Sequence, residues 1–384
     1  MAIDFGQNGT DAGYLGSGWS GPEEGYRWAI GPQSELWLNN PGGTGDYVLE
    51  LDIGPFVLPP AITAQRFSIS LRGALVGRST LSVRGQVGYR VPGSLFAEPG
   101  PLRLIFDHPD ATPPNKLAAH RDSRPLAVCF YSLRLSRVAG DIETVRLEPW
   151  KGVVPAEIGK LAGTPALRFM LNFESLGDNC EFGLVQRRCG AEPLGLLRFS
   201  NLELHRLLWC LETQFDGLGE ISHLEYRLSE GNKPEYVIRD RRSSLVFHTF
   251  LHEGEVTEAD LLPQQARRLN LLRRKILEDL HNGEKIFVCK RNVTLSEQEI
   301  LPLHAALNRY GPNSLLWVVS GDGAHPPGTV DQLMPGLMRG YIDRFAPYEN
   351  AHDLSLEAWL SITVNAFLMQ REARKASPSE HAAQ

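Results

Sequence analysis

A cysteine near the middle of the chain has the sequence surroundings of a nucleophile. Cys180 follows the turn-forming residues Leu176–Asn179 and precedes Glu181–Arg188, whose composition predicts a short helix. Unpaired backbone N–H groups and the helix dipole at a helix N-terminus favour a thiolate over a thiol. The alternative interpretation is a small apolar side chain that fills a strand–helix junction, since free cysteines are often buried.

A thiolate that attacks a carbonyl group needs a base, a group that orients the base, and donors for the oxyanion. His248 is the candidate base, because it lies 68 residues after Cys180 on a predicted strand. The candidate orienting residues are Asn292 and Asp322, each of which follows a predicted buried strand. Asn179, or the backbone N–H of Cys180, is the candidate oxyanion donor. Spacing alone does not choose among these residues, and a histidine in an apolar strand can also be a hydrogen-bonded core residue.

No motif in the sequence predicts a bound cofactor or metal ion. The chain has no glycine-rich nucleotide fingerprint, no HExxH zinc motif and no GxSxG elbow. His248 and His252 are four residues apart, but a strand holds side chains at this spacing too far apart to share a metal ion. We therefore predict no cofactor and no metal.

Apolar patterns predict a strand–helix–strand frame around the candidate residues. The segments Leu167–Phe173, Lys285–Cys289 and Leu315–Val319 are predicted strands. The last two should be parallel, because a predicted helix at Ser296–Tyr310 connects them. Sites in parallel α/β sheets lie at the carboxyl ends of the strands. Further helices or strands are predicted at Asn201–Phe215, Glu235–Arg239, Ser244–Phe250, Asp260–Asn282 and Leu356–Ala373.

The amino-terminal third consists of short alternating segments separated by glycine and proline. Such spacing predicts an antiparallel β-sandwich of jelly-roll type. The predicted strands are Ser34–Leu38, Tyr47–Ile53, Arg66–Leu71, Leu102–Phe106 and Leu126–Leu135. Trp19, Trp28 and Trp37 lie in this region and could stack on sugar rings, although core filling is the ordinary role of such residues.

The composition is that of a soluble globular protein. The 384 residues suit two domains, and a net charge of −6 gives no general attraction for nucleic acid or anionic membranes. No apolar run is long enough to span a membrane, and the first residues, MAIDFGQNGT, show no signal peptide. Five scattered cysteines without CxxC spacing argue against disulfides. We expect a cytoplasmic protein with no nucleic-acid partner.

We therefore expect an α+β protein of two domains with different architectures. Residues 1–140 form the predicted jelly-roll-like β-sandwich, as a glycan-binding or accessory domain. Residues 141–164 show no sustained period and are predicted to be a linker. Residues 165–375 form the predicted α/β domain, and residues 376–384 should be a disordered tail.

The sequence SLGDNCEFG, followed by LLRFSN, carries a resemblance to a known family. The pattern resembles an uncharacterised bacterial family of papain-like cysteine peptidases, over roughly residues 167 to 320. The matching residues are Ser175, Leu176, Gly177, Cys180, Leu197, Arg198, Ser200 and His248, followed by the apolar strand in residues 285–292. The resemblance implies a papain-like carboxyl-terminal domain with a Cys–His pair. The chain departs from the family at Asn201-Leu-Glu-Leu, where Pro-Phe-Asp-Trp is common, and at Thr249, where Asp is common.

Three functional hypotheses follow. The first is a cysteine-dependent hydrolase or acyltransferase that acts on an amide or ester in an unknown peptide, acyl or glycan substrate. The second is a non-catalytic protein that binds a glycan or envelope polymer through the sandwich. The pattern of short strands and turns in the sandwich resembles that of accessory domains beside bacterial glycan-processing enzymes. The third is an enzyme associated with polysaccharide biosynthesis, which the lack of an Asp-x-Asp motif in the α/β domain disfavours.

Overall fold

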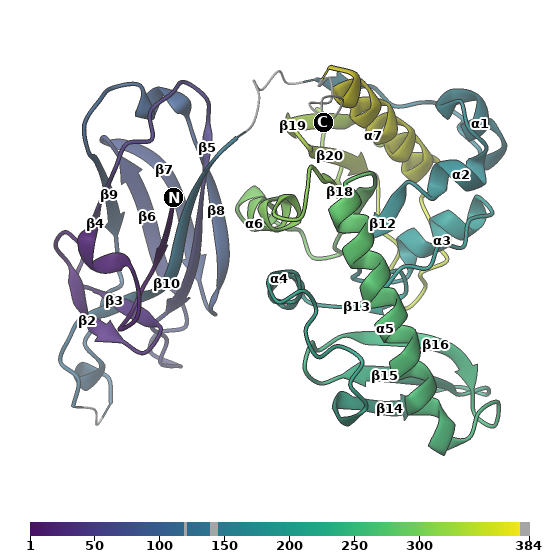
Figure 1. Cartoon of the computed structure of the whole chain (residues 1–384), viewed down its shortest axis with the longest axis horizontal. Helices are drawn as coiled ribbons and strands as arrows, with labels where there is room; N and C mark the ends of the chain where they lie inside the picture. Colours follow the sequence, from purple (N-terminus) through teal and green to yellow (C-terminus); the bar gives the residue numbers. More distant parts are fainter. Residues whose placement is uncertain (119–120, 139–144, 377–384) are drawn as a thin grey trace, which may run out of the picture. The chain divides into compact units, whose positions relative to one another are not determined.

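The computed structural model describes residues 1–118, 121–138 and 145–376, which form two compact units (Figure 1). The first unit comprises residues 1–141 with 296–302, and the second comprises residues 142–295 with 303–384. The start of the predicted linker, at 141–144, and the predicted tail after Ala376 lie outside the described residues. Within the described residues, no helix combines the length and apolar character needed to cross a bilayer.

The first unit is a sandwich of two antiparallel sheets, as predicted. The six-stranded sheet contains β1 (Ala2–Asp4), β2 (Trp19–Glu23), β3 (Tyr26–Ile30), β5 (Tyr47–Pro55), β8 (Gly85–Val91) and β10 (Leu126–Arg137). The four-stranded sheet contains β4 (Gln33–Leu38), β6 (Gln65–Leu71), β7 (Ala74–Leu81) and β9 (Leu102–Asp107). Short 3-10 helices lie at Asp11–Gly13, Gly93–Phe96 and Pro114–Lys116.

Alternation of apolar side chains produces this sandwich. In β6, Phe67, Ile69 and Leu71 are buried while the residues between them are more exposed. These side chains share one core with Ile53 and Phe130 of the six-stranded sheet, so the two sheets face each other. All five strands predicted in this unit are present, because each has one apolar face that the opposite sheet buries.

The second unit is built on a mostly parallel sheet of six strands. Its order is β11 (Arg146–Leu147), β19 (Val330–Met334), β20 (Leu337–Ile342), β18 (Ser314–Ser320), β17 (Ile286–Lys290) and β12 (Phe173–Ser175). Strands β12, β17, β18 and β20 run parallel, including the predicted pair β17 and β18. The carboxyl ends of these strands therefore meet at one edge of the sheet. The papain-like character expected for this unit stays a prediction.

Six α-helices, the second half of α6 and a second sheet complete the described part of this unit (Figure 1). The helices are α1 (Pro155–Ala162), α2 (Ala166–Met170), α3 (Glu181–Arg188), α4 (Leu204–Glu212), α5 (Glu258–Asn282), α6 (Glu297–Asn308) and α7 (Leu356–Ala376), with a 3-10 turn at Ile221–His223. The second sheet is antiparallel, in the order β13 (Ser200–Asn201), β16 (Val246–His252), β15 (Glu235–Asp240) and β14 (Leu224–Leu228). Side chains of α1, α2, α3 and α7 share a core with one face of the parallel sheet.

Two sequence-based expectations for this unit were wrong. The predicted strand Leu167–Phe173 is mostly the helix α2, and only Phe173 belongs to a strand. Pro165 precedes that helix, where its fixed backbone angle is compatible with a helix start. The segment predicted to be a linker contains α1 and β11, and β11 pairs with β19.

Candidate functional site

The loop between β12 and α3 holds an unusual backbone conformation. Gly177 and Asp178 both have positive φ angles, of 90° and 94°. A non-glycine residue rarely adopts this region, so Asp178 is strained unless its surroundings hold it. Such strain often accompanies a functional loop. Cys180 follows at the N-cap position of α3, which begins at Glu181, and its side chain makes no capping hydrogen bond.

The carboxylate of Asp178 holds this loop through contacts with two distant segments. It accepts hydrogen bonds from the backbone N–H of Asn292 at 3.1 Å and from the Tyr348 hydroxyl at 3.0 Å. The Nζ of Lys290 lies 3.6 Å from the same carboxylate. Burial and the negative charge of Asp178 raise the pKa of Tyr348 to about 12, so this hydroxyl stays a donor at neutral pH.

Lys290 also joins the end of β17 to the start of α3. Its Nζ lies 2.8 Å from Oε2 of Glu181, and both side chains are almost completely buried. The other oxygen of Glu181 accepts a hydrogen bond of 2.9 Å from the indole N–H of Trp359 in α7. Oε2 makes this ion pair without a hydrogen bond of good geometry in the described chain, so the Lys290 charge is its compensation for burial. The first turn of α3 is therefore fixed to the sheet and to α7.

Cys180 is the most accessible cysteine of the chain, since it is partly exposed while the other four are buried. Its thiol does not have the lowered pKa that the helix N-terminus predicts. Burial raises the pKa, the charge of Glu235 raises it further, and Arg187 and Lys290 lower it by less. At neutral pH the side chain is therefore a thiol rather than a preformed thiolate.

Glu235 is the functional candidate that the sequence analysis missed. Its Oε2 lies 3.2 Å from Nδ1 of His248, and its Oε1 accepts a hydrogen bond of 2.7 Å from the backbone N–H of Phe250. The pairing of β15 with β16 shifts register next to Glu235, and Phe250 has a positive φ of 60°. The shifted pairing accompanies the contact between the carboxylate of Glu235 and the imidazole of His248. Because its charge also acts on Cys180, Glu235 influences both members of the predicted pair.

His248 lies near the surface, with 46% of its side chain exposed. When Nδ1 donates to Glu235, Nε2 is left as an acceptor that can take a proton. No hydrogen bond joins His248 to Cys180 within the described residues. Catalytic hydrogen bonds are often long or poorly aligned without substrate, so this geometry is compatible with a base that engages when substrate binds.

Neither predicted orienting residue contacts His248 in the described part of the chain. Asn292 lies close to the nucleophile loop, but its side chain binds Lys290 and donates to the carbonyl of Ala346. Asp322 accepts a hydrogen bond of 2.6 Å from His325, and this hydrogen bond lowers the pKa of Asp322. Each side chain is therefore occupied by a nearer partner. The sequence offered no signal for this, because both residues follow strands as a site residue would.

The two ends of the side chain of Asn179, the predicted oxyanion donor, differ in their hydrogen bonding. Its Oδ1 accepts a hydrogen bond of 3.0 Å from the backbone N–H of Glu181. Its Nδ2 is buried without a hydrogen-bond partner in the described chain, and so is the hydroxyl of Ser200. A buried donor without a partner is costly, and a ligand oxygen would relieve that cost.

The tryptophans of the sandwich differ in their surroundings. Trp19 packs against Phe5, Phe106 and Phe130 and donates its indole N–H to a backbone carbonyl, so it belongs to the core. Trp28 contacts other aromatic rings and is partly buried. Trp37 is 43% exposed.

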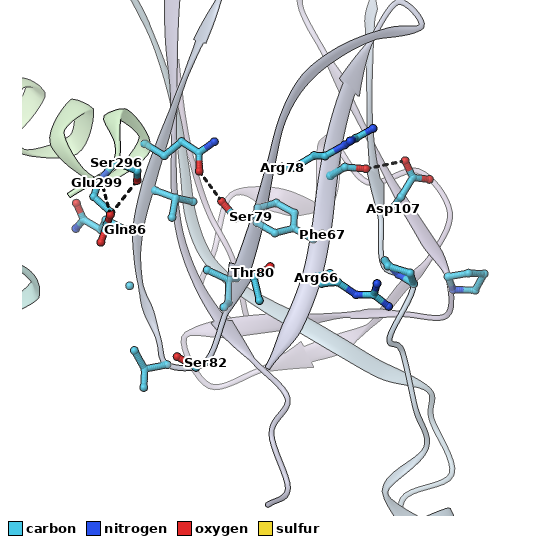
Figure 2. A pocket seen from close by; sticks show the side chains of 18 residues that line it. Arg66, Phe67, Arg78, Ser79, Thr80, Ser82, Gln86, Asp107, Ser296 and Glu299 are labelled. Atoms are coloured by element: carbon cyan, nitrogen blue, oxygen red, sulfur yellow. Dashed lines mark hydrogen bonds between the residues drawn. The ribbon is translucent and has the colours of Figure 1, made fainter. Parts of the chain in front are cut away.

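Beside Trp37 in the sandwich, the four-stranded sheet carries a polar outer row. The guanidinium of Arg103 lies 5.8 Å from the centre of the Trp37 ring. Ser68 donates a hydrogen bond of 3.2 Å to Asp107, and Figure 2 shows Asp107 near the exposed Arg66 and Arg78. This surface has the polar and aromatic groups that a sugar could contact.

Comparisons with known proteins identify no family for this chain. No protein-family model matches it, and no curated protein matches it. Among solved structures, the chain is similar to the carbohydrate-binding module CBM6 of LamC, a laminarinase from Zobellia galactanivorans, with 14% identity and a TM-score of 0.23. That match covers 35% of this chain and 98% of the module.

Two carbohydrate esterases are also among the similar structures. An acetyl xylan esterase from Butyrivibrio proteoclasticus has 9% identity and a TM-score of 0.23, over 99% of this chain and 87% of the esterase. A family two carbohydrate esterase from Clostridium thermocellum has 12% identity and a TM-score of 0.20, over 34% of this chain and 33% of the esterase. Scores this low carry no argument about this chain, so its function has to be inferred from its own residues.

Proposed function

We propose that the protein is a cysteine-dependent hydrolase or acyltransferase that acts on an ester or amide. Cys180 is the nucleophile, His248 is the base, and Glu235 is the positioning residue that orients the imidazole. The observation that supports this most directly is the position of Glu235, which binds Nδ1 of His248 and whose charge acts on the Cys180 thiol. The accessibility of Cys180 and the strained loop before it add further support.

The proposed reaction begins from a thiol on Cys180, with the imidazole of His248 as the base. His248 Nε2 takes the proton from Cys180 as Sγ attacks the carbonyl carbon, and Asn179 Nδ2 donates a hydrogen bond to the oxyanion that forms. When the tetrahedral intermediate collapses, the leaving alcohol or amine takes that proton from His248 and a thioester remains on Cys180. Water, or an acceptor hydroxyl, then attacks the thioester with His248 again as the base. The acid or the transferred ester is released and the thiol is restored.

This scheme retains the Cys–His pair that the papain-like resemblance implies. It replaces Asn292 and Asp322 with Glu235 in the orienting role, because only Glu235 of the three contacts His248. The neutral thiol at the start of the scheme follows from the raised pKa of Cys180.

The acyl-enzyme is the species to measure. We expect incubation with p-nitrophenyl acetate to add one acetyl group to the tryptic peptide that contains Cys180, as detected by mass spectrometry. Cys180→Ala should remove the adduct, and His248→Gln should slow its formation by about 10²- to 10⁴-fold, the usual contribution of a general base. His252→Gln is the matched control, since His252 lies on the same strand and its Nδ1 contacts the backbone carbonyl of Lys233.

Two results would contradict the proposal. One is the absence of any adduct on Cys180, and the other is an adduct that forms equally fast in the His248→Gln variant. Either result would favour the alternative function, glycan binding through the sandwich. The exposed ring of Trp37, next to Arg103, is the observation that supports that alternative.

A further inference from the structure

A groove of about 590 Å³ lies against the second sheet of the second unit. Strand pairing places Val237 opposite His248 and Arg239 opposite Val246, so these four side chains share one face of the sheet. The other face carries buried residues such as Phe247 and packs against α5 (Figure 1). The groove therefore lies on the face that carries the candidate base.

Charged side chains dominate the lining of this groove. Arg206, Arg227 and Arg239 provide three guanidinium groups, and Glu203 and Glu225 provide two carboxylates. Arg239 lies 3.8 Å from Glu225, which is a loose contact for an ion pair. In the described chain, Arg206 and Arg227 have no ion-pair partner. The groove thus has guanidinium groups available for an anion.

Two contacts connect the groove to the proposed catalytic residues. Asn201, which lines the groove, donates a hydrogen bond of 3.1 Å to the backbone carbonyl of Asp178, two residues before Cys180. Val237, which also lines it, is the register partner of His248. A ligand in the groove would therefore extend from the sheet face toward the nucleophile loop.

We propose that this groove binds an acidic oligosaccharide and places one of its carboxylated sugars beside Cys180, an inference that rests on the proposed function. Planar guanidinium groups bind carboxylates in a bidentate manner. The carboxylates of Glu203 and Glu225 suit the hydroxyl groups of a sugar, which donate hydrogen bonds. The aliphatic residues that line the groove are Val237 and Val246, and Tyr226 is its one aromatic residue, whereas grooves for peptides usually present apolar pockets for side chains.

Binding is best measured in the full-length Cys180→Ala variant, which cannot turn over a substrate. We expect tetragalacturonate to bind in isothermal titration calorimetry and neutral cellotetraose to bind at least ten-fold more weakly. Arg227→Gln and Arg239→Gln should each weaken tetragalacturonate binding by about ten-fold, and the double variant by more. Affinity should also fall as salt is raised, because the guanidinium groups are exposed.

Arg274→Gln is the matched control, because Arg274 is an exposed arginine of α5 that does not line the groove. The proposal is overturned if Arg274→Gln weakens binding as much as the groove variants, or if neither groove variant weakens it. Equal binding of cellotetraose would overturn the role of the guanidinium groups. Stronger binding of a pentaglutamate peptide than of tetragalacturonate would overturn the assignment to a sugar.

This measurement is independent of the test of the proposed function. If tetragalacturonate does not bind but the acyl-enzyme forms on Cys180, the groove proposal fails and the enzyme proposal stands. If tetragalacturonate binds through the arginines but Cys180 is inert, the enzyme proposal fails. In that case the groove remains a binding site without the chemistry that we attach to it.

Discussion

At the level of single residues, the carboxylate of Glu235 acts on two titratable groups in opposite ways. It binds the imidazole of His248 through Nδ1, and its negative charge raises the pKa of the Cys180 thiol by disfavouring the thiolate. Glu235→Gln should therefore lower the pKa of Cys180 and speed its alkylation by iodoacetamide at pH 8. The same change should slow acetylation by p-nitrophenyl acetate by at least about ten-fold, since the base loses its positioning residue.

The opposite direction of these two effects is what makes the Glu235 prediction specific. A residue that merely stabilises the fold would change both rates in the same direction when it is replaced. Glu255→Gln serves as the control, because Glu255 is a carboxylate that follows β16, the strand of His248, and contacts Lys233 and the backbone of His252. Faster acetylation in Glu235→Gln, or alkylation that becomes slower, would contradict the proposed arrangement.

At the level of elements, Lys290 connects β17 to α3, and through Glu181 to α7. Removing one member of a buried ion pair leaves an uncompensated charge, which typically costs about 3–5 kcal/mol. Lys290→Met should therefore lower the free energy of unfolding of this unit by about that amount. The double variant Lys290→Met/Glu181→Gln should recover part of the loss, because Glu181 is then no longer a buried charge without its ammonium partner.

The loss of stability in Lys290→Met is measured by urea unfolding, with hydrogen exchange of peptides from α3 and β17 as the readout. These peptides report on the unit that contains Lys290 and Glu181. Lys375→Met is the control: Lys375 pairs with Glu372 on the exposed end of α7, where an ion pair contributes little. If Lys290→Met and Lys375→Met shift the urea midpoint equally, the buried cluster does not hold these elements together.

Strands with a regular apolar pattern could be predicted from sequence, because the residues that the pattern marks as apolar are the residues that are buried. β6 alternates, and β17 is buried throughout, as its apolar run suggested. The strand predicted at Leu167–Phe173 was wrong because an alternation over so few residues also fits a short helix. In the folded chain, Phe169 and Met170 are adjacent and both completely buried, which a helix packed on a sheet allows.

The site was predictable only where local sequence determines it. A cysteine placed between a turn and a helix is a local signal, and the structure has Cys180 at that position. Glu235 has no local signal, because it meets His248 only through the shifted pairing of β15 with β16. The raised pKa of Cys180 was likewise hidden, since it depends on burial and on that distant carboxylate.

At the level of the whole molecule, each unit contains a histidine that folding keeps neutral. Burial lowers the pKa of His108 in the first unit and of His304 in the second to about 4. A histidine in an unfolded chain has a pKa of about 6.5. Between these values the unfolded state binds more protons than the folded state, so stability rises with pH across this range. Each histidine thus contributes stability that is present above pH 6.5 and lost as the pH falls toward 4.

His108 allows this acid sensitivity to be tested in the first unit alone. Its Nε2 lies 2.9 Å from the hydroxyl of Ser34, a contact that glutamine can imitate without titrating. We expect hydrogen exchange in β4 and β9 of the native protein to report a loss of about 3 kcal/mol between pH 7 and pH 4, and His108→Gln to remove most of that loss. Peptides from β17 and β18 should keep their acid dependence in the variant, since the second unit has a separate core and its own histidine. His205→Gln, at an exposed position, is the control that should change neither set of peptides. An unchanged slope in β4 and β9 of His108→Gln would mean that other groups destabilise the sandwich in acid, because the variant has no imidazole at this position to protonate.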